Sequence, residues 1–151
     1  MSEAAAPAFT DAEILKRFGG SGPMPGASAL MGFRLLRVDQ AAREIEAGFT
    51  ATAQFCNPMG AVQGGFLTAM LDDAMSVAGL VTSGMTHVMP TLEMKTSFLR
   101  PASPGELFAI GRVVKWGRTI AFTEGELYDP DRRLVAKASA TAMPAPMKPR
   151  A

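Results

Sequence analysis

The stretch from Asn57 to Leu80 joins a glycine-marked turn to an apolar run that carries two adjacent acids. Gly64 and Gly65 stand directly before this run, where a helix would begin. The first turn of a helix exposes backbone N–H groups that have no partner inside the helix. Together with the helix dipole, these donors attract an anion or a carbonyl oxygen. The stretch therefore offers a group that can polarise a carbonyl and a carboxylate that can act as a base or a nucleophile.

The two acids, Asp72 and Asp73, interrupt a run of mostly Ala, Leu, Met and Val without proline or a basic residue. Such a run predicts a helix over 66–80 that is buried on most of its surface. Burying an unpaired carboxylate costs several kcal/mol, and adjacent helical residues point about 100° apart. We therefore expect one acid to be solvated and the other to take part in chemistry. Asp72 is the candidate for chemistry, and Asp73 is predicted to form a salt bridge or to lie at a subunit interface.

The spacing of Gly64 and Asp72 predicts an oligomer. The two residues are eight positions apart, which corresponds to about 12 Å along a helix axis, so one small reacting group cannot contact both. If both serve one site, they must come from two copies of the chain whose helices run antiparallel across a dimer interface. Activity of a strict monomer would contradict this hypothesis.

Composition narrows the function classes. The chain has 151 residues, a hydrophobic fraction of 48% and a net charge of +1, which favours one globular domain and gives no general reason to expect nucleic acid or a membrane surface as a partner. The one cysteine, Cys56, and the one histidine, His87, exclude an intramolecular disulfide and a Cys/His zinc site. The N-terminus lacks a signal-peptide pattern, and the apolar runs are too short or too acidic to span a bilayer. We expect a soluble, cytoplasmic protein without a metal.

The remaining segments predict strands around the helix. Thr10 to Glu13 matches a capping box that opens a short helix ending at Phe18. Alternation and turn residues predict six strands, at Phe33–Val38, Glu44–Thr52, Val88–Leu99, Leu107–Trp116, Thr119–Tyr128 and Leu134–Met143. In the third strand, one face is predicted to carry Val88, Leu92, Met94 and Phe98, and the other Thr91, Glu93, Lys95 and Ser97. Turns are predicted at Gly117–Arg118 and at Asp129–Asp131. The predicted class is α+β, with an antiparallel sheet wrapped on one long helix.

Three regions follow from this order. Residues 1–26 are a leader with the short helix, in which Met1–Phe9 is loose and Gly19–Gly26 is a connection. Residues 27–143 form the main domain, and residues 144–151, with three prolines, form a tail that we expect to be frayed.

The motif Asn57, Gly60, Gln63, Gly64, Gly65 and Asp72, followed by the hairpin Lys115–Phe122, resembles hotdog-fold acyl-CoA thioesterases of the phenylacetate-degradation (PaaI-like) branch. The resemblance covers roughly residues 27–143. It implies a hotdog fold, a homodimer or homotetramer, and hydrolysis of an acyl-CoA without a cofactor other than the coenzyme A of the substrate.

The resemblance also implies roles for particular residues. The Gly64 N–H would bind the thioester oxygen, Asn57 would position the carbonyl or a water, and Asp72 of the other subunit would be base or nucleophile. Thr91 corresponds to a hydroxyl that orients the water. Gln63 and Gly65 would contact the substrate, and coenzyme A phosphates would meet Arg100, Lys115 and Arg118.

Each of these residues also has a structural interpretation. The glycines permit close packing, Asn57 before Pro58 forms turns, and Thr91 suits a strand. Cys56 is better explained as a small buried residue than as a nucleophile, and His87 as a surface residue. Most methionines are expected to fill the core or interfaces, although Met70, Met75 and Met89 could shape an acyl pocket.

Gln63 departs from the family pattern, which has histidine at this position. Glutamine hydrogen-bonds but cannot exchange a proton near neutral pH, so proton transfer by this residue is excluded. This keeps open a non-catalytic acyl-CoA binding protein as the alternative. A hotdog enoyl-CoA hydratase or dehydratase is a further alternative, which the lack of a histidine near the helix disfavours.

Overall fold

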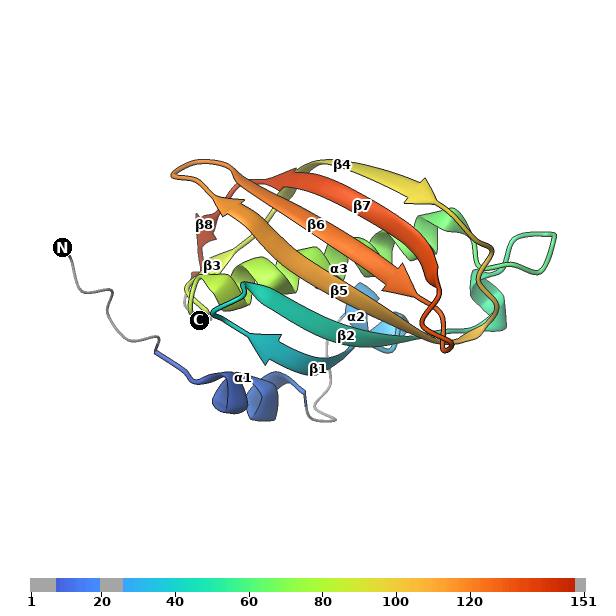
Figure 1. The fold of residues 1–151 in the computed structure, drawn as a ribbon, viewed down its shortest axis with the longest axis horizontal. Helices are drawn as coiled ribbons and strands as arrows, with labels where there is room; N and C mark the ends of the chain where they lie inside the picture. Colours follow the sequence, from blue (N-terminus) through green and yellow to red (C-terminus); the bar gives the residue numbers. More distant parts are fainter. Residues whose placement is uncertain (1–7, 20–25, 149–151) are drawn as a thin grey trace.

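The computed structural model describes residues 8–19 and 26–148, which form an antiparallel sheet curled around one long helix (Figure 1). The helices are α1 (Asp11–Phe18), α2 (Gly26–Leu30) and α3 (Gly64–Thr82), with a single 3₁₀ turn at Ala53–Phe55. The strands are β1 (Arg34–Asp39), β2 (Glu44–Ala51), β3 (His87–Val88), β4 (Thr91–Phe98), β5 (Gly105–Trp116), β6 (Ala121–Tyr128), β7 (Leu134–Ala142) and β8 (Ala145–Pro146). The predicted loose residues 1–7 and connecting residues 20–25 lie outside the described ranges. The boundaries between leader, domain and tail stay predictions.

The main sheet has the order β1-β2-β5-β6-β7-β4, and every neighbouring pair is antiparallel. These six strands correspond to the six predicted segments. Both hairpin turns are confirmed, since Gly117 N donates to the Ile120 carbonyl and Arg132 N donates to the Asp129 carbonyl. The arrangement is the hotdog fold that the resemblance implied, and β1 and β4 are its two edges.

Helix α3 occupies the concave side of the sheet. Its 19 residues contain no proline, and it extends the predicted helix by two residues at each end. By length and composition α3 is the one helix of the described residues that could cross a membrane, but it packs inside the sheet as a core helix. Gly111 of β5 makes this packing close, because a Cβ atom there would lie 2.2 Å from the Ala74 carbonyl oxygen.

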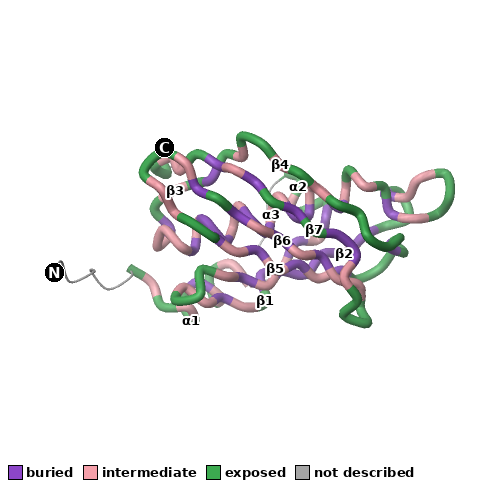
Figure 2. Tube along the Cα trace, turned by 45° about the horizontal axis from the view of Figure 1, so that its top comes forward, coloured by how far each residue is buried: buried purple, intermediate pink, exposed green. Residues whose placement is uncertain are grey.

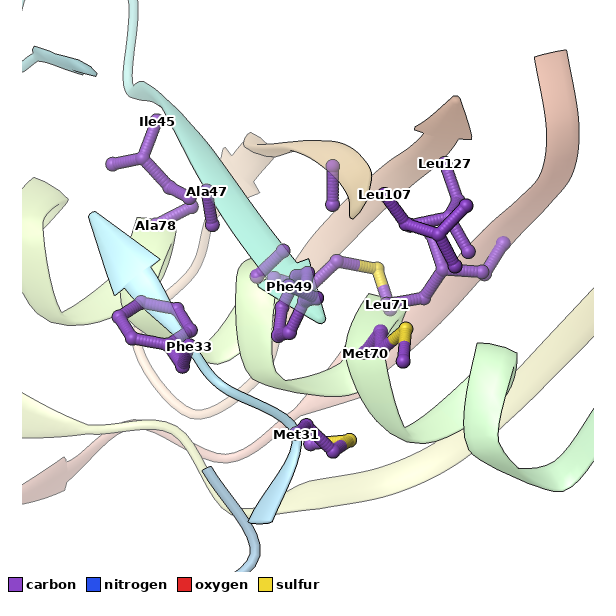
Figure 3. Packing of buried hydrophobic residues seen from close by; sticks show 14 of the residues in the cluster. Met31, Phe33, Ile45, Ala47, Phe49, Met70, Leu71, Ala78, Leu107 and Leu127 are labelled. Atoms are coloured by element: carbon purple, nitrogen blue, oxygen red, sulfur yellow. The ribbon is translucent and has the colours of Figure 1, made fainter. Parts of the chain in front are cut away.

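The core fills the space between α3 and the sheet (Figure 3). Ile45, Ala47 and Phe49, at alternate positions of β2, have no exposed surface. Burial alternates along the other central strands as well (Figure 2). Met70, Met75 and Met89 are at most 4% exposed, so they fill the core as expected.

The outward face of the sheet carries a network of ion pairs that runs from β1 across β2, β5 and β6 to β7. Arg112 lies 3.4 Å from Glu44 and 3.3 Å from Glu126, and Lys137 lies 3.5 Å from Glu126. Arg37 also pairs with Glu44. The positive and negative side chains pair with one another, so this surface of the sheet faces the solvent.

The segment Val88–Leu99 differs from the single strand that its alternation predicted. It is divided into β3 and β4 before Thr91, and the register of β4 against β7 shifts between Thr91 and Glu93. Pro90, which cannot donate to a ladder, stands at the division. The register shift inserts an extra residue, so Thr91 points to α3 and not to the side of Glu93. The predicted faces of this segment were therefore wrong at Thr91.

Two short elements were not predicted. Gly26–Leu30 forms α2, in a segment that had no helical pattern. The tail, expected to be frayed, pairs at Ala145–Pro146 with β3, and Met147 N donates to the Thr86 carbonyl. At the other end, the capping box of Thr10 and Glu13 is confirmed, and α1 contributes Ile14 to the core.

Candidate active site

The candidate site follows the line where α3 faces β4, which we name the α3–β4 seam. It consists of Gly64, Thr68 and Asp72 on α3 and Thr91, Thr96 and Phe98 on β4. Residues four apart lie on the same face of a helix, so the three α3 positions form one stripe. Each of the three positions meets one β4 residue.

At one end of the seam, the Thr91 hydroxyl donates a hydrogen bond to Asp72 Oδ1 at 2.6 Å. Both side chains are partly buried. A hydroxyl bonded to one carboxylate oxygen orients the carboxylate and leaves the other oxygen for a second partner. This contact joins two residues that the sequence analysis had assigned to one site.

At the other end, α3 begins at Gly64, after Gln63 in an extended conformation. The N–H groups of Gly64 and Gly65 have no backbone acceptor within the described residues, as expected for a first helical turn. The Phe98 ring lies directly on Gly64, since a Cβ atom there would be 2.9 Å from the ring. The packing interpretation therefore holds for Gly64, whose N–H has no backbone acceptor among the described residues. Gly65 is exposed, and a Cβ atom added there would meet no other atom within 4 Å.

Asp73 lies beside the seam and faces α2. Burial raises the pKa of its carboxyl, the Ser28 hydroxyl lowers it, and the negative charge of Asp72 raises it further. Its Oδ2 is buried without a hydrogen-bond partner in the described residues. Among the described residues, none forms the salt bridge that was predicted for Asp73. Both acids are partly exposed, so burial alone does not separate a solvated acid from an employed one, and that expectation stays a prediction. Ser28 belongs to α2, so the tertiary fold and not the local sequence sets the surroundings of Asp73.

Asn57 organises the loop before α3. Its Oδ1 accepts from the N–H groups of Met59 at 3.0 Å and Ala61 at 3.2 Å, and its own N–H donates to the Ala61 carbonyl. The turn-forming interpretation therefore holds, while the side-chain NH₂ group is not used by these bonds. Phe66 of α3 stacks on Phe55 at 4.1 Å, which attaches the other side of the loop to the helix.

Gln63 is exposed at the start of α3, and its side chain makes no capping hydrogen bond. Its backbone N–H donates to the Phe55 carbonyl at 2.8 Å. The geometry of the helix start thus depends on the backbone of Gln63 and not on its side chain.

The three predicted phosphate-binding residues are not together in one chain. Arg100 follows β4 at the Gly64 end of α3. Lys115 and Arg118 belong to the β5–β6 hairpin, at the opposite end of α3 (Figure 1). Lys115 lines a groove on the outward face of the sheet with Phe122. All three cations are exposed.

Two remaining candidates have structural roles. Cys56 is half-buried, and its backbone forms an isolated antiparallel β-bridge with Val62 in the loop before α3. His87 was expected at the surface but is half-buried, with Nδ1 2.8 Å from the Thr86 hydroxyl and its ring edge-on to Trp116. It lies beyond the C-terminal end of α3, away from Gly64.

The seam also contains residues that the sequence analysis missed. Thr68 and Thr96 hydrogen-bond at 3.3 Å between the two ends of the seam, and Phe98 covers Gly64. The signal for Thr68 was present in the sequence, because it stands midway between Gly64 and Asp72 at helical spacing. Phe98 and Thr96 lie on the face of Met94, as alternation along regular β4 requires, but no sequence signal marked their contacts with α3.

Comparisons with known proteins agree with this fold. The family model described as the thioesterase superfamily matches residues 59–136. A solved structure from Ralstonia eutropha JMP134, a phenylacetic acid degradation-related protein, is 38% identical, with a TM-score of 0.77 over 87% of this chain and 97% of that chain. A structure from Streptococcus mutans bound to acetyl CoA is 21% identical, with a TM-score of 0.66 over 78% of this chain and 91% of that chain, and shows the shared fold.

A curated relative from Saccharolobus solfataricus, named as an esterase, is 34% identical over 86 residues. That match covers 56% of this chain and 60% of the relative, so the chain spans less than two thirds of that protein. The family model alone covers more than half of the chain, and the resemblance to the phenylacetate-degradation branch is confirmed. The chain belongs to the thioesterase superfamily.

Proposed function

We propose that this protein hydrolyses an acyl-CoA thioester to a free acid and coenzyme A, using Gly64 of one subunit and Asp72 of another. The observation that carries the proposal is the hydrogen bond of 2.6 Å between Thr91 and Asp72, on the same stripe of α3 as the free N–H groups at its start. The site thus holds an oriented carboxylate and an oxygen-binding helix end, the two groups that thioester hydrolysis needs.

In the proposed reaction, the thioester oxygen accepts a hydrogen bond from the Gly64 N–H. Asp72 takes a proton from water, and the water oxygen forms a bond to the carbonyl carbon. The negative charge moves to the carbonyl oxygen, where the helix N-terminus stabilises it. The C–S bond then breaks, and the coenzyme A thiolate leaves with the electron pair. Direct attack by Asp72, followed by hydrolysis of the anhydride, is the alternative with the same residues.

Two features support an antiparallel pair of subunits. Gly64 and Asp72 of one chain are about 12 Å apart along α3, too far for one carbonyl group. Strand β4 is an edge of the sheet, and Leu92, Phe98 and Leu99, on the strand and directly after it, are 53–55% exposed. Apolar residues on an open edge favour pairing with another chain. A two-fold axis outside the chain, perpendicular to α3 and level with the middle of the seam, would place each Gly64 beside the partner's Asp72.

Coenzyme A is the proposed thiol because a relative of the same fold is bound to acetyl CoA. Arg100 of one subunit and Lys115 and Arg118 of the other are the proposed phosphate contacts, since antiparallel subunits bring opposite ends of α3 together. The acyl group is proposed to be of medium size, aliphatic or aromatic. The reaction needs no cofactor besides the substrate, and we expect it to take place in the cytoplasm.

One observation favours a second candidate. Gln63 at the start of α3 cannot exchange a proton, which suits a protein that binds acyl-CoA without cleaving it. A hydratase is less well supported, because the one histidine lies beyond the far end of α3.

The test is release of coenzyme A from short, medium, long and aromatic acyl-CoAs, with wild type and Asp72→Asn compared. We expect turnover by the wild type and a fall of at least about a hundredfold in the variant, as for loss of a general base. Saturable binding without turnover would favour the binding protein. Equal turnover by both would remove Asp72 from the mechanism.

A further inference from the structure

The Thr68 hydroxyl occupies the middle of the seam and bonds across it. A threonine in a helix usually donates to the carbonyl four residues earlier, as Thr82 does to Ala78 at 2.7 Å. Thr68 instead donates to the Thr96 hydroxyl on β4 at 3.3 Å. The two threonines on α3 therefore differ in their acceptors. Thr82 donates to a backbone carbonyl of its own helix, whereas Thr68, in the seam, donates to a side chain of β4.

The pair leaves one donor unused. Each hydroxyl has one hydrogen, and the hydrogen of Thr68 is used on Thr96. The hydrogen of Thr96 has no acceptor among the described residues. Both threonines are half-buried, so the Thr96 hydroxyl is open to solvent or to a bound group. The seam therefore presents an O–H group to whatever occupies it.

The distance between this hydroxyl pair and Gly64 determines which substrate atom could reach the hydroxyl. Thr68 is four residues from Gly64, about 6 Å along the helix axis toward the middle of the seam. A chain of five bonds, each projecting about 1.2 Å, covers the same distance. An oxygen about five bonds from the thioester carbon would thus reach the hydroxyl pair while the thioester oxygen contacts Gly64.

Other side chains of the seam do not compete for this role. The Phe98 ring covers Gly64 and forms an apolar wall, and Asp72 is bonded to Thr91. Between the two ends, Thr68 and Thr96 are the polar side chains that face each other.

We propose that Thr68 and Thr96 are specificity-determining residues that select acyl groups carrying an acceptor oxygen, such as a keto oxygen, about five bonds from the thioester carbon. This inference rests on the proposed function, because it takes Gly64 as the carbonyl-binding end. Thr96 donates to the acceptor, and Thr68 holds the Thr96 hydroxyl in position.

The experiment compares hexanoyl-CoA with 5-oxohexanoyl-CoA, which differ by the one oxygen. We expect the wild type to prefer the 5-oxo substrate by roughly three- to tenfold in kcat/KM, the effect of one net hydrogen bond. Thr96→Val is expected to bring the ratio close to one, Thr68→Val to reduce it, and Thr96→Ser to retain it. Thr82→Val is the matched control for a threonine substitution on α3 and is expected to keep the wild-type ratio.

Calorimetric titration of the same two acyl-CoAs separates this inference from the proposed function. If neither compound is hydrolysed, the acyl-CoA panel decides the thioesterase proposal, and the ratio of Kd values still reports on the hydroxyl pair. A wild-type ratio of one, or a preference that survives in Thr96→Val, overturns the inference even when both compounds are hydrolysed.

Discussion

The Thr91 hydroxyl donates to the Asp72 carboxylate at 2.6 Å, and this contact exists because the register of β4 shifts directly after Thr91. Without the shift, Thr91 would point with Glu93 to the outward face, where it could not meet α3. The candidate base is therefore oriented by an irregularity in the sheet.

Thr91→Val removes this hydrogen bond while keeping the shape of the side chain. We expect kcat to fall by about tenfold, because the Asp72 carboxylate is no longer held in its orientation. The change in KM is expected to be smaller, because the contacts that bind the substrate stay in place. Thr91→Ser is expected to restore most of the rate. Steady-state kinetics on one good acyl-CoA measures both, and an equal loss in the serine and valine variants would assign Thr91 a packing role.

Mixed subunits test whether the site is shared. Gly64→Pro removes the N–H group, and the extended Gln63 before it has a conformation compatible with a following proline. The ring of Phe98 is half exposed and can move away from the added Cβ. We expect Gly64→Pro and Asp72→Asn each to be nearly inactive alone.

After unfolding and refolding of the two variants together, half of the dimers would be mixed and each would hold one intact site. The expected activity is about a quarter of that of the wild type. Circular dichroism of each variant verifies folding. If the mixture stays as inactive as its components, Gly64 and Asp72 do not serve one site in trans.

Gln63→His restores the residue that the related branch carries. Since the Gln63 side chain makes no capping bond, the substitution leaves the helix start in place. We expect equal or higher hydrolysis of acyl-CoA, measured by coenzyme A release. A large loss of activity would show that glutamine has a role of its own.

Asp73→Asn is expected to stabilise the protein in a pH-dependent way. Burial raises the pKa of Asp73 above its ordinary value of 3.8. Below that value the carboxyl is protonated in both the folded and the unfolded state, and burial carries no charge penalty. As the pH rises toward the folded-state pKa, the unfolded state ionises first, so the wild type loses stability.

Thermal melts from pH 3 to pH 8 measure the difference between Asp73→Asn and wild type. We expect the variant to gain over the wild type as the pH rises and the gain to level off above the folded-state pKa. A constant difference at every pH would mean that ionisation of Asp73 does not oppose folding.

The sequence by itself determined the elements that local patterns encode. The apolar run without proline specified α3, the alternation of β2 specified its buried face, and the capping box specified the start of α1. These signals depend on residues close in the chain, where helical and strand periodicity act. The motif from Asn57 to Asp72 carried the resemblance that indicated a thioesterase, and the spacing of Gly64 and Asp72 predicted that a shared site needs two subunits.

Only the tertiary structure decided which side chains meet. Thr91 reaches Asp72 through the shift in β4, and Thr96 faces Thr68 because of the same strand's position at the sheet edge. Asp73 is half-buried with Oδ2 enclosed, and Ser28 of α2, a helix without a helical pattern in the sequence, lies beside its carboxyl. Such contacts join residues 19–45 positions apart, and no periodicity in the sequence records a partner at that distance.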